Sequence, residues 1–189
     1  MAVSPATALA RNLTWKDFKP KDKPAPPPGE IATSALTHVE LGFGPISVKP
    51  VDGKFKLKPE PDVKVMFQAD SWVAKYVSTW DQDKQDALLD HEQIHYLIAA
   101  ITARDRANEL HEIAGREYDT SGECIEDVKA SHARLDAQDI QDKYDDDTKG
   151  QPSTFTAEQT KWATAVRSCL ATNKPLRPAL EAVGLMPRP

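Results

Sequence analysis

The sequence has few cysteines and no long apolar segment. Cys124 and Cys169 are too few for a disulfide framework and too far apart for a cysteine-based zinc knuckle, and whether they are bonded to each other stays open. No segment reaches the roughly 18 apolar residues of a membrane helix, so we expect no membrane insertion. The first residues lack the basic and apolar stretches of a secretory signal. We therefore expect a soluble, cytoplasmic protein; the alternative is a periplasmic or secreted one, because a removed signal would leave the same sequence.

Basic residues are also in the minority. The chain carries 24 lysines and arginines against 29 aspartates and glutamates, a net charge of -5. Because this charge repels nucleic acid and anionic lipid surfaces, neither is an expected partner. The 189 residues, 40% of them hydrophobic, suit one globular domain with a sizeable core. We expect that domain to be a monomer.

The residue pattern changes twice in the first half of the chain. Residues 20–30 are too rich in proline for a helix or a central strand, so residues 1–30 are expected to form a loosely held arm and an extended connector, before a single domain over 31–189. Between residues 36 and 68, apolar and polar side chains alternate, which predicts three or four antiparallel strands. Asp52-Gly53 is a strong signal for a two-residue hairpin turn.

After the predicted strands, the spacing of apolar residues changes to that of a helix. No proline or glycine occurs after Ser78 until Gly115, which predicts one helix over 79–114, with Ser78 and Asp81 at capping-box spacing. Residues 94–103 are apolar nearly all round, so this helix should be central and packed on several sides. A second helix is expected over 123–147, forming a hairpin with the first, and an amphipathic helix over 156–173. Strands followed by helices indicate the α+β class.

The predicted central helix carries a metal-binding pattern. In "LLDHEQIHYLIAAITAR", His91 and His95 are four residues apart and therefore project from the same helix face, around Glu92. This His-Glu-x-x-His pattern is typical of zinc enzymes, in which two imidazoles bind Zn²⁺ and the glutamate acts as general base on a bound water. The alternative interpretation is a chance match on a core helix.

A zinc site of this kind needs a third protein ligand. The metzincin continuation would place glycine at 98 and histidine at 101, and Ile98 and Ile101 exclude that class. Acidic residues 20 or more positions beyond His95 would lie roughly 30 Å along a continuous helix, which argues against them. The downstream acidic candidates are Glu112, Glu117, Glu123 and Asp127.

The helical hairpin brings a different acidic run to the histidines. With a turn near residue 119, residue 143 lies opposite 95 and residue 147 opposite 91, so "KYDDDTKG" is expected beside the zinc. Three aspartates at a helix C-terminus oppose the helix dipole, and a bound cation would compensate them. Tyr144 could donate a hydrogen bond to the oxyanion of a tetrahedral intermediate; packing in the core is the alternative role.

Several ordered motifs resemble one known family. They are "LTWKDF" at residues 13–18, "SWV" at 71–73, "LLDHEQIH", "ITAR", "YDDDT" and "AEQTKW" at 157–162. In these motifs, over most of its length, the chain resembles the bacterial zinc-dependent proteases grouped as domain of unknown function 922. The resemblance implies a zincin-like fold, with a small antiparallel sheet packed on a helical bundle whose central helix carries the zinc motif. It also implies a peptidase with undefined substrates.

The chain departs from that family in three ways. Ile94 stands where the family has glycine, Leu97 and Ala100 stand where it has acidic residues, and Lys149-Gly150 follow Thr148 where it has Asn-His-Gly. If the missing histidine is the family's third ligand, an aspartate must replace it. Asp145 matches the family aspartate, and Asp147 matches the family glutamate. The resemblance thus favours Asp145 as the ligand and leaves Asp147 or a downstream glutamate as alternatives.

These patterns together predict a zinc metallopeptidase. His91, His95 and Asp145 are the expected ligands, Glu92 the general base, and Tyr144 an oxyanion donor. The expected partner is a protein or peptide substrate. The alternative is a catalytically impaired protein that keeps zinc as a structural element of a binding module.

Overall fold

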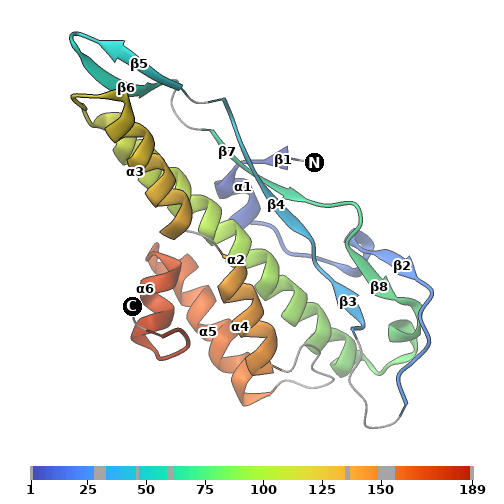
Figure 1. The fold of residues 1–189 in the computed structure, drawn as a ribbon. Coiled ribbons are helices and arrows are strands. Elements are labelled where there is room, and N and C mark those ends of the chain that lie inside the picture. Colours follow the sequence, from blue (N-terminus) through green and yellow to red (C-terminus); the bar gives the residue numbers. More distant parts are fainter. Residues whose placement is uncertain are drawn as a thin grey trace.

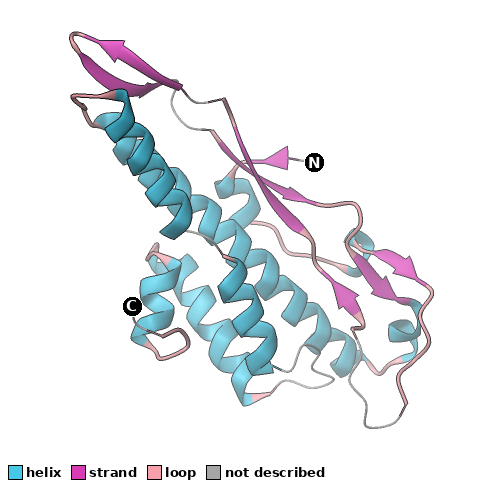
Figure 2. Ribbon diagram, in the orientation of Figure 1, coloured by secondary structure: helices cyan, strands magenta, loops and turns pink. Residues whose placement is uncertain are grey.

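One long helix, α2 (Gln82–Gly115), runs through the middle of the molecule (Figure 1). The computed structural model describes residues 2–27, 33–45, 47–58, 62–134, 137–148 and 156–187. Strands lie along one side of α2, and the C-terminal helices lie along the other (Figure 2). The predicted α+β class is therefore confirmed.

The start of α2 differs from the prediction. The helix begins after Asp81, whose carboxylate accepts a hydrogen bond from the Lys84 N–H at 2.9 Å. Ser78 lies instead in a short 3₁₀ helix, η2 (Lys75–Thr79), and its hydroxyl donates to the Lys75 carbonyl. The predicted capping box is thus wrong, because Asp81 alone satisfies a free N–H group of the first turn.

The strands form small sheets along α2. In the first, β7 (Val63–Phe67) pairs antiparallel with β1 (Ala2–Val3) and β4 (Val39–Phe43). In the second, β8 (Trp72–Ala74) pairs with the other two strands, β2 (Lys19–Lys21) in parallel and β3 (Ala35–Leu36) antiparallel.

The predicted hairpin is also present. Strands β5 (Ser47–Val51) and β6 (Lys54–Lys58) pair antiparallel. The connecting residues Asp52 and Gly53 have φ of 51° and 77°, which is the left-handed pair that a type I′ turn requires. One small sheet of three or four strands was expected. The described strands, each two to five residues long, instead divide among several sheets.

The N-terminal residues are more tightly packed than expected. Helix α1 (Pro5–Leu9) contacts α2, and Ala8, Leu13 and Phe18 are buried in the core. The Leu13 N–H donates to the Gln93 side-chain oxygen at 2.6 Å, which ties this segment to α2. Because these apolar side chains are buried in the core, the segment before the proline-rich stretch folds with the domain rather than as a loose arm. The predicted boundary at residue 30 lies outside the described residues.

The region predicted as one helix over 123–147 contains two. Helix α3 (Ser121–Arg134) packs on α2 and on the β5–β6 hairpin, whereas α4 (Gln138–Thr148) packs on α2 and on α5. The single-helix prediction is wrong because the two halves bury their apolar faces against different neighbours. Residues 135–136 lie outside the described part of the chain.

The last predicted helix is confirmed as α5 (Ala157–Thr172). Thr156 caps its first turn, and Asn173 ends it in the left-handed conformation. A further helix, α6 (Leu176–Ala182), occupies part of the proline-punctuated tail, which the sequence did not predict as helical.

The central position of α2 explains its apolar character. Ile94, Ile98 and Ile101 pack with Trp162 and other side chains of the C-terminal helices. On the opposite face, Tyr96 packs with the strand and N-terminal side chains. Within the described residues, no helix has both the length and the apolar character needed to cross a membrane. Cys124 and Cys169 are both buried and free.

Candidate metal centre

The two motif histidines lie side by side in the first half of α2. Their ring centroids are 4.6 Å apart, and the two Nε2 atoms approach to 3.0 Å. His91 is buried and His95 is largely so. The i, i+4 spacing therefore does what helix geometry predicts, and it directs one nitrogen of each ring to the same point.

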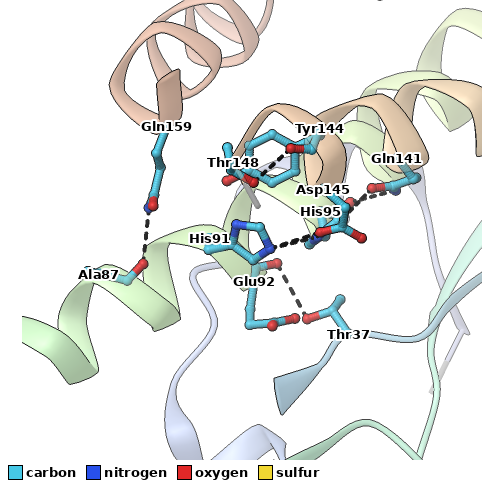
Figure 3. A network of polar contacts seen from close by, with 10 residues as sticks. All are labelled: Thr37, Ala87, His91, Glu92, His95, Gln141, Tyr144, Asp145, Thr148 and Gln159. Carbon is cyan, nitrogen blue, oxygen red and sulfur yellow. Dashed lines mark hydrogen bonds and ion pairs between the residues drawn. The ribbon is translucent and has the colours of Figure 1, made fainter. Parts of the chain in front are cut away.

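Helix α4 brings Asp145 to that point. Its Oδ1 lies 3.1 Å from His91 Nε2 and 2.9 Å from His95 Nε2 (Figure 3). This confirms that the "YDDDT" run lies beside the histidines, although residue 141, not 143, contacts residue 95. The shift of register has a simple cause, because the assumed continuous helix is broken before α4.

The three atoms form a donor set that fits a cation. His91, His95 and Asp145 could together hold a metal ion. Two imidazole nitrogens and one carboxylate oxygen are typical zinc ligands, and in tetrahedral coordination with bonds of about 2.0–2.1 Å, neighbouring ligand atoms are about 3.3 Å apart. The observed separations of 2.9 to 3.1 Å are close to this value. These residues therefore fit a metal ion without rearrangement of the helices.

A glutamine fixes the orientation of His95. Its Nδ1–H donates to the Gln141 side-chain oxygen at 2.6 Å, and the Gln141 amide nitrogen donates to the His95 carbonyl at 3.0 Å. Because the amide oxygen can only accept, Nδ1 carries a proton, and Nε2 is the nitrogen that faces Asp145 and that a metal ion would bind after displacing the proton there. This is the arrangement that metal-binding histidines commonly have.

The electrostatics of the three groups favour cation binding. Burial raises the pKa of Asp145, but hydrogen bonds from His91 and His95 outweigh burial and hold this pKa well below its usual range. Burial lowers the pKa of His91, which keeps its ring neutral. Burial also lowers the pKa of His95, but its contacts with Asp145 outweigh this and raise it. The site thus combines an ionised Asp145 carboxylate, a neutral His91 ring and a His95 ring whose additional proton a bound cation would displace.

Glu92 lies beside the three ligand residues. Its side chain is buried, with 2% exposed, and it points toward Thr37 in the link between β3 and β4 (Figure 3). The Thr37 hydroxyl approaches the Glu92 main-chain oxygen at 3.4 Å. Within the described part of the chain, the Glu92 carboxylate makes no hydrogen bond or ion pair. A buried carboxylate of this kind is costly unless it has a function or an added partner.

A pocket of about 560 Å³, lined by both polar and apolar side chains, reaches this centre. Residues 35–39 line it on the strand side. On the helix side, its lining comes from His91, Glu92 and His95 of α2 and from Gln138, Gln141, Asp142 and Asp145 of α4. His91 and Glu92 are buried at the edge of this pocket, and Asp145, with 49% of its side chain exposed, opens the centre to water.

Tyr144 lies behind the histidines. Its ring stacks on His91 with centroids 4.7 Å apart and also packs against Trp162. The hydroxyl is buried, and burial raises its pKa far above the ordinary value. It has no hydrogen-bond partner among the described residues and does not line the pocket. This position fits the core-packing alternative, and the oxyanion role stays a prediction.

The other acidic candidates do not join the histidines. Asp147 pairs with Lys143 and accepts a hydrogen bond from the Trp162 indole at 3.0 Å. Those near the far end of α2 have partners there: Glu117 pairs with Lys56, Glu123 accepts from the Asp119 N–H, and Asp127 pairs with Arg116. Glu112 is exposed and is not part of the metal-binding group. Lys149 and Gly150, where the family has its histidine, lie outside the described residues.

Sequence reasoning missed three polar residues at this site. Gln141 comes from α4, and Thr37 and His38 come from the link between two strands. None has a local motif, because their importance depends on which elements meet at the pocket. Only the contact between α2 and α4 could have indicated Gln141, one turn before Asp145 on the same face.

Comparisons with known proteins do not add to this picture. No protein-family model matches the chain, and no curated protein or solved structure matches it. Function must therefore be inferred from the geometry of the site.

Proposed function

We propose that this protein is a zinc-dependent metallopeptidase with a zincin-like active-site helix. One observation carries the proposal: His91 Nε2, His95 Nε2 and Asp145 Oδ1 converge within 3.1 Å of one another, and their residues line an open pocket. A set of three protein ligands with access for water is typical of catalytic zinc sites. Structural zinc sites usually have four protein ligands.

The ligand set supports zinc as the metal. Imidazole and carboxylate ligands suit zinc, whereas magnesium and calcium prefer oxygen ligands alone. His91 supplies a neutral ring, and Gln141 directs Nε2 of His95 toward the shared point. Zinc bound there would polarise a carbonyl group and make a bound water a stronger acid.

Glu92 is the proposed general base. Its buried carboxylate lines the same pocket as the three ligand residues and is not itself one of the group. As the oxygen of water adds to the peptide carbonyl carbon, Glu92 accepts the proton that the water loses. It then gives this proton to the leaving nitrogen when the C–N bond breaks. A non-catalytic zinc site has no need for such a carboxylate.

Metal analysis tests the first half of the proposal. Protein purified without chelators should contain about one zinc per chain, by the three-ligand rule. A His91→Ala, His95→Ala double variant should lose this zinc. His111→Ala is the matched control, because His111 is exposed on the same helix and bonds only to the Ala107 carbonyl among the described residues. Equal zinc in the double variant and the control would refute this site.

Glu92→Gln tests the second half. This variant should retain zinc but lose peptide hydrolysis by several orders of magnitude, because the amide cannot accept the proton of the attacking water. Glu112→Gln, an exposed position on the same helix, should leave turnover unchanged. Undiminished turnover in Glu92→Gln would overturn the proposed role.

The alternative is a zinc-stabilised binding protein. Cobalt substitution followed by titration with a hydroxamate distinguishes the two. An open catalytic site should change its visible spectrum as the inhibitor displaces water. A spectrum that does not respond would favour a closed structural site.

A further inference from the structure

Apart from its histidines, the pocket has only acidic residues among its ionisable lining groups. Glu92, Asp142 and Asp145 contribute carboxylates, whereas lysine and arginine are absent from the described lining. Glu92 is 2% exposed, and its carboxylate has no hydrogen bond or ion pair among the described residues. Because water and salt screen a buried charge less than an exposed one, this carboxylate strengthens the negative potential inside the pocket. The pocket therefore favours cationic groups over anionic ones.

Asp142 lies on the face of α4 that meets the histidines. It directly follows Gln141, whose side chain contacts His95 Nδ1 at 2.6 Å. It also lies three residues before Asp145, whose Oδ1 is 2.9 Å from His95 Nε2 (Figure 3). Residues three apart on a helix are neighbours on one face, with Cβ atoms about 5–6 Å apart. The Asp142 side chain is therefore about one helical turn from the three ligand atoms.

The Asp142 carboxylate is held in place but is not neutralised. Gln138 Nε2 donates to its Oδ1 at 2.8 Å from the preceding turn of α4. No lysine or arginine of the described residues pairs with Asp142, whereas Asp139 on the same helix pairs with Arg177. Asp142 is also exposed. A cation that enters the pocket therefore meets a positioned carboxylate with an oxygen left to accept a hydrogen bond.

The strand side of the pocket adds an apolar surface. Leu36 and Val39 line this side, and Leu36 is 45% exposed. Lysine and arginine have an aliphatic stem that packs on apolar surface and a charged end that stays hydrated or paired. The volume of about 560 Å³ is within the range that is typical of ligand pockets. An apolar wall together with an unneutralised carboxylate fits a long basic side chain.

We propose that Asp142 selects peptide substrates with lysine or arginine near the scissile bond, by accepting a hydrogen bond from the ammonium or guanidinium group. This inference rests on the proposed metallopeptidase function and names its substrate class. Asp142 acts in binding and not in the reaction, because Glu92 takes the proton of the attacking water. An acidic substrate side chain at the same position is disfavoured, since Asp142 and Glu92 repel it.

Matched peptides separate the charge of the substrate from its shape. A peptide set places arginine, citrulline or glutamate at each position near the cleaved bond; citrulline has nearly the shape of arginine but no charge. At the preferred position, kcat/KM should be roughly tenfold higher for arginine than for citrulline. This is the lower end for a hydrogen bond to a charged group, because Asp142 is exposed. Added salt should lower the ratio, because it screens exposed charges.

Two substitutions of Asp142 and a matched control test the residue itself. Asp142→Asn should make the arginine and citrulline peptides nearly equal, and Asp142→Lys should make the glutamate peptide better than the arginine peptide. Zinc content and Tm should equal those of the wild type, because Asp142 is exposed and is not in the metal-binding group. Asp146→Asn removes the same charge from an exposed position of α4 outside the pocket lining and should keep the wild-type preference.

Binding supplies a readout besides activity. The zinc-loaded Glu92→Gln variant should bind the peptides without cleaving them, and calorimetry then gives their affinities. Its affinity should be higher for the arginine peptide than for the citrulline peptide by a factor similar to the ratio in kcat/KM. A Glu92→Gln, Asp142→Asn double variant should lose this difference.

The outcomes separate this inference from the function on which it rests. Wild-type protein that hydrolyses no peptide, with a Glu92→Gln variant that binds none, overturns both. Arginine-selective binding through Asp142 without hydrolysis overturns the metallopeptidase function and leaves Asp142 as the site of cation binding. Hydrolysis with equal kcat/KM for arginine and citrulline, or a preference that Asp142→Asn leaves unchanged, overturns the role of Asp142 alone. So does an equal loss of preference in Asp146→Asn, because that result assigns the effect to the net charge of α4.

Discussion

The hydrogen bonds between Gln141 and His95 predict an effect on metal affinity that does not depend on catalysis. Gln141→Leu removes the acceptor of the His95 Nδ1–H at 2.6 Å and the donor to the His95 carbonyl at 3.0 Å. Leucine has a similar volume, so the packing of α4 on α2 should persist. What changes is the ring of His95, which loses both its fixed tautomer and its fixed orientation.

The size of the effect can be worked from these two contacts. Removing such a partner of a metal-binding histidine typically lowers metal affinity about 10–100-fold, or about 1.4–2.7 kcal/mol. Two lost hydrogen bonds of about 1 kcal/mol each give a similar total. The ring without zinc is also held by the Asp145 contact at 2.9 Å, so the lower half of this range is expected.

Competition with a fluorescent zinc chelator measures this affinity directly. Gln138→Leu is the control, because Gln138 lines the same pocket on the same helix but donates to Asp142 rather than to a histidine. Gln141→Leu should bind zinc at least 10-fold more weakly than the control. Equal affinities in the two variants would show that the metal is not bound through His95 Nε2 in the described geometry.

Three further predictions concern other polar side chains of the described structure. Asp145→Ala should abolish tight zinc binding in the chelator assay, whereas Asp147→Ala should keep it. Asp147→Ala should instead lower the free energy of unfolding in urea by about 1–3 kcal/mol, because the buried Trp162 indole loses its acceptor. The reverse pattern would show that Asp147, not Asp145, is the ligand. Tyr144→Phe should leave the free energy of unfolding equal or raise it, because the buried hydroxyl has no partner among the described residues, and a tenfold loss of kcat would instead support the oxyanion role. Burial raises the pKa of Asp17, but hydrogen bonds from Thr14 and Arg11 hold it below 3.8, so its stabilisation exists above pH 3.8 and is lost as the pH falls through the lowered value. Asp17→Asn should therefore cost about 1 kcal/mol at pH 7 and nothing in strong acid, and a difference independent of pH in urea unfolding would contradict this.

Local signals in the sequence were sufficient for α2, α5 and the hairpin. The long stretch without proline or glycine predicted α2, and Asp52-Gly53 predicted the turn between β5 and β6. These features depend on backbone preferences within a few residues, which the sequence states directly. The packed N-terminal segment was missed because its burial depends on Gln93 and other side chains about 80 positions away.

The choice between Asp145 and Asp147 shows where sequence reasoning ends. Residues two apart on a helix point in directions about 200° apart, so α4 can present only one of these carboxylates to the histidines. Which one it presents is decided on the opposite side of α4, where Trp162 of α5 donates to Asp147 and Tyr144 packs against the same indole. The acidic run thus marks the metal-binding helix in the sequence, and the rotation that places Asp145 at the histidines comes from the packing of α5. A substitution that removes the indole donor but keeps the ring volume should therefore loosen the position of Asp145 without touching a ligand.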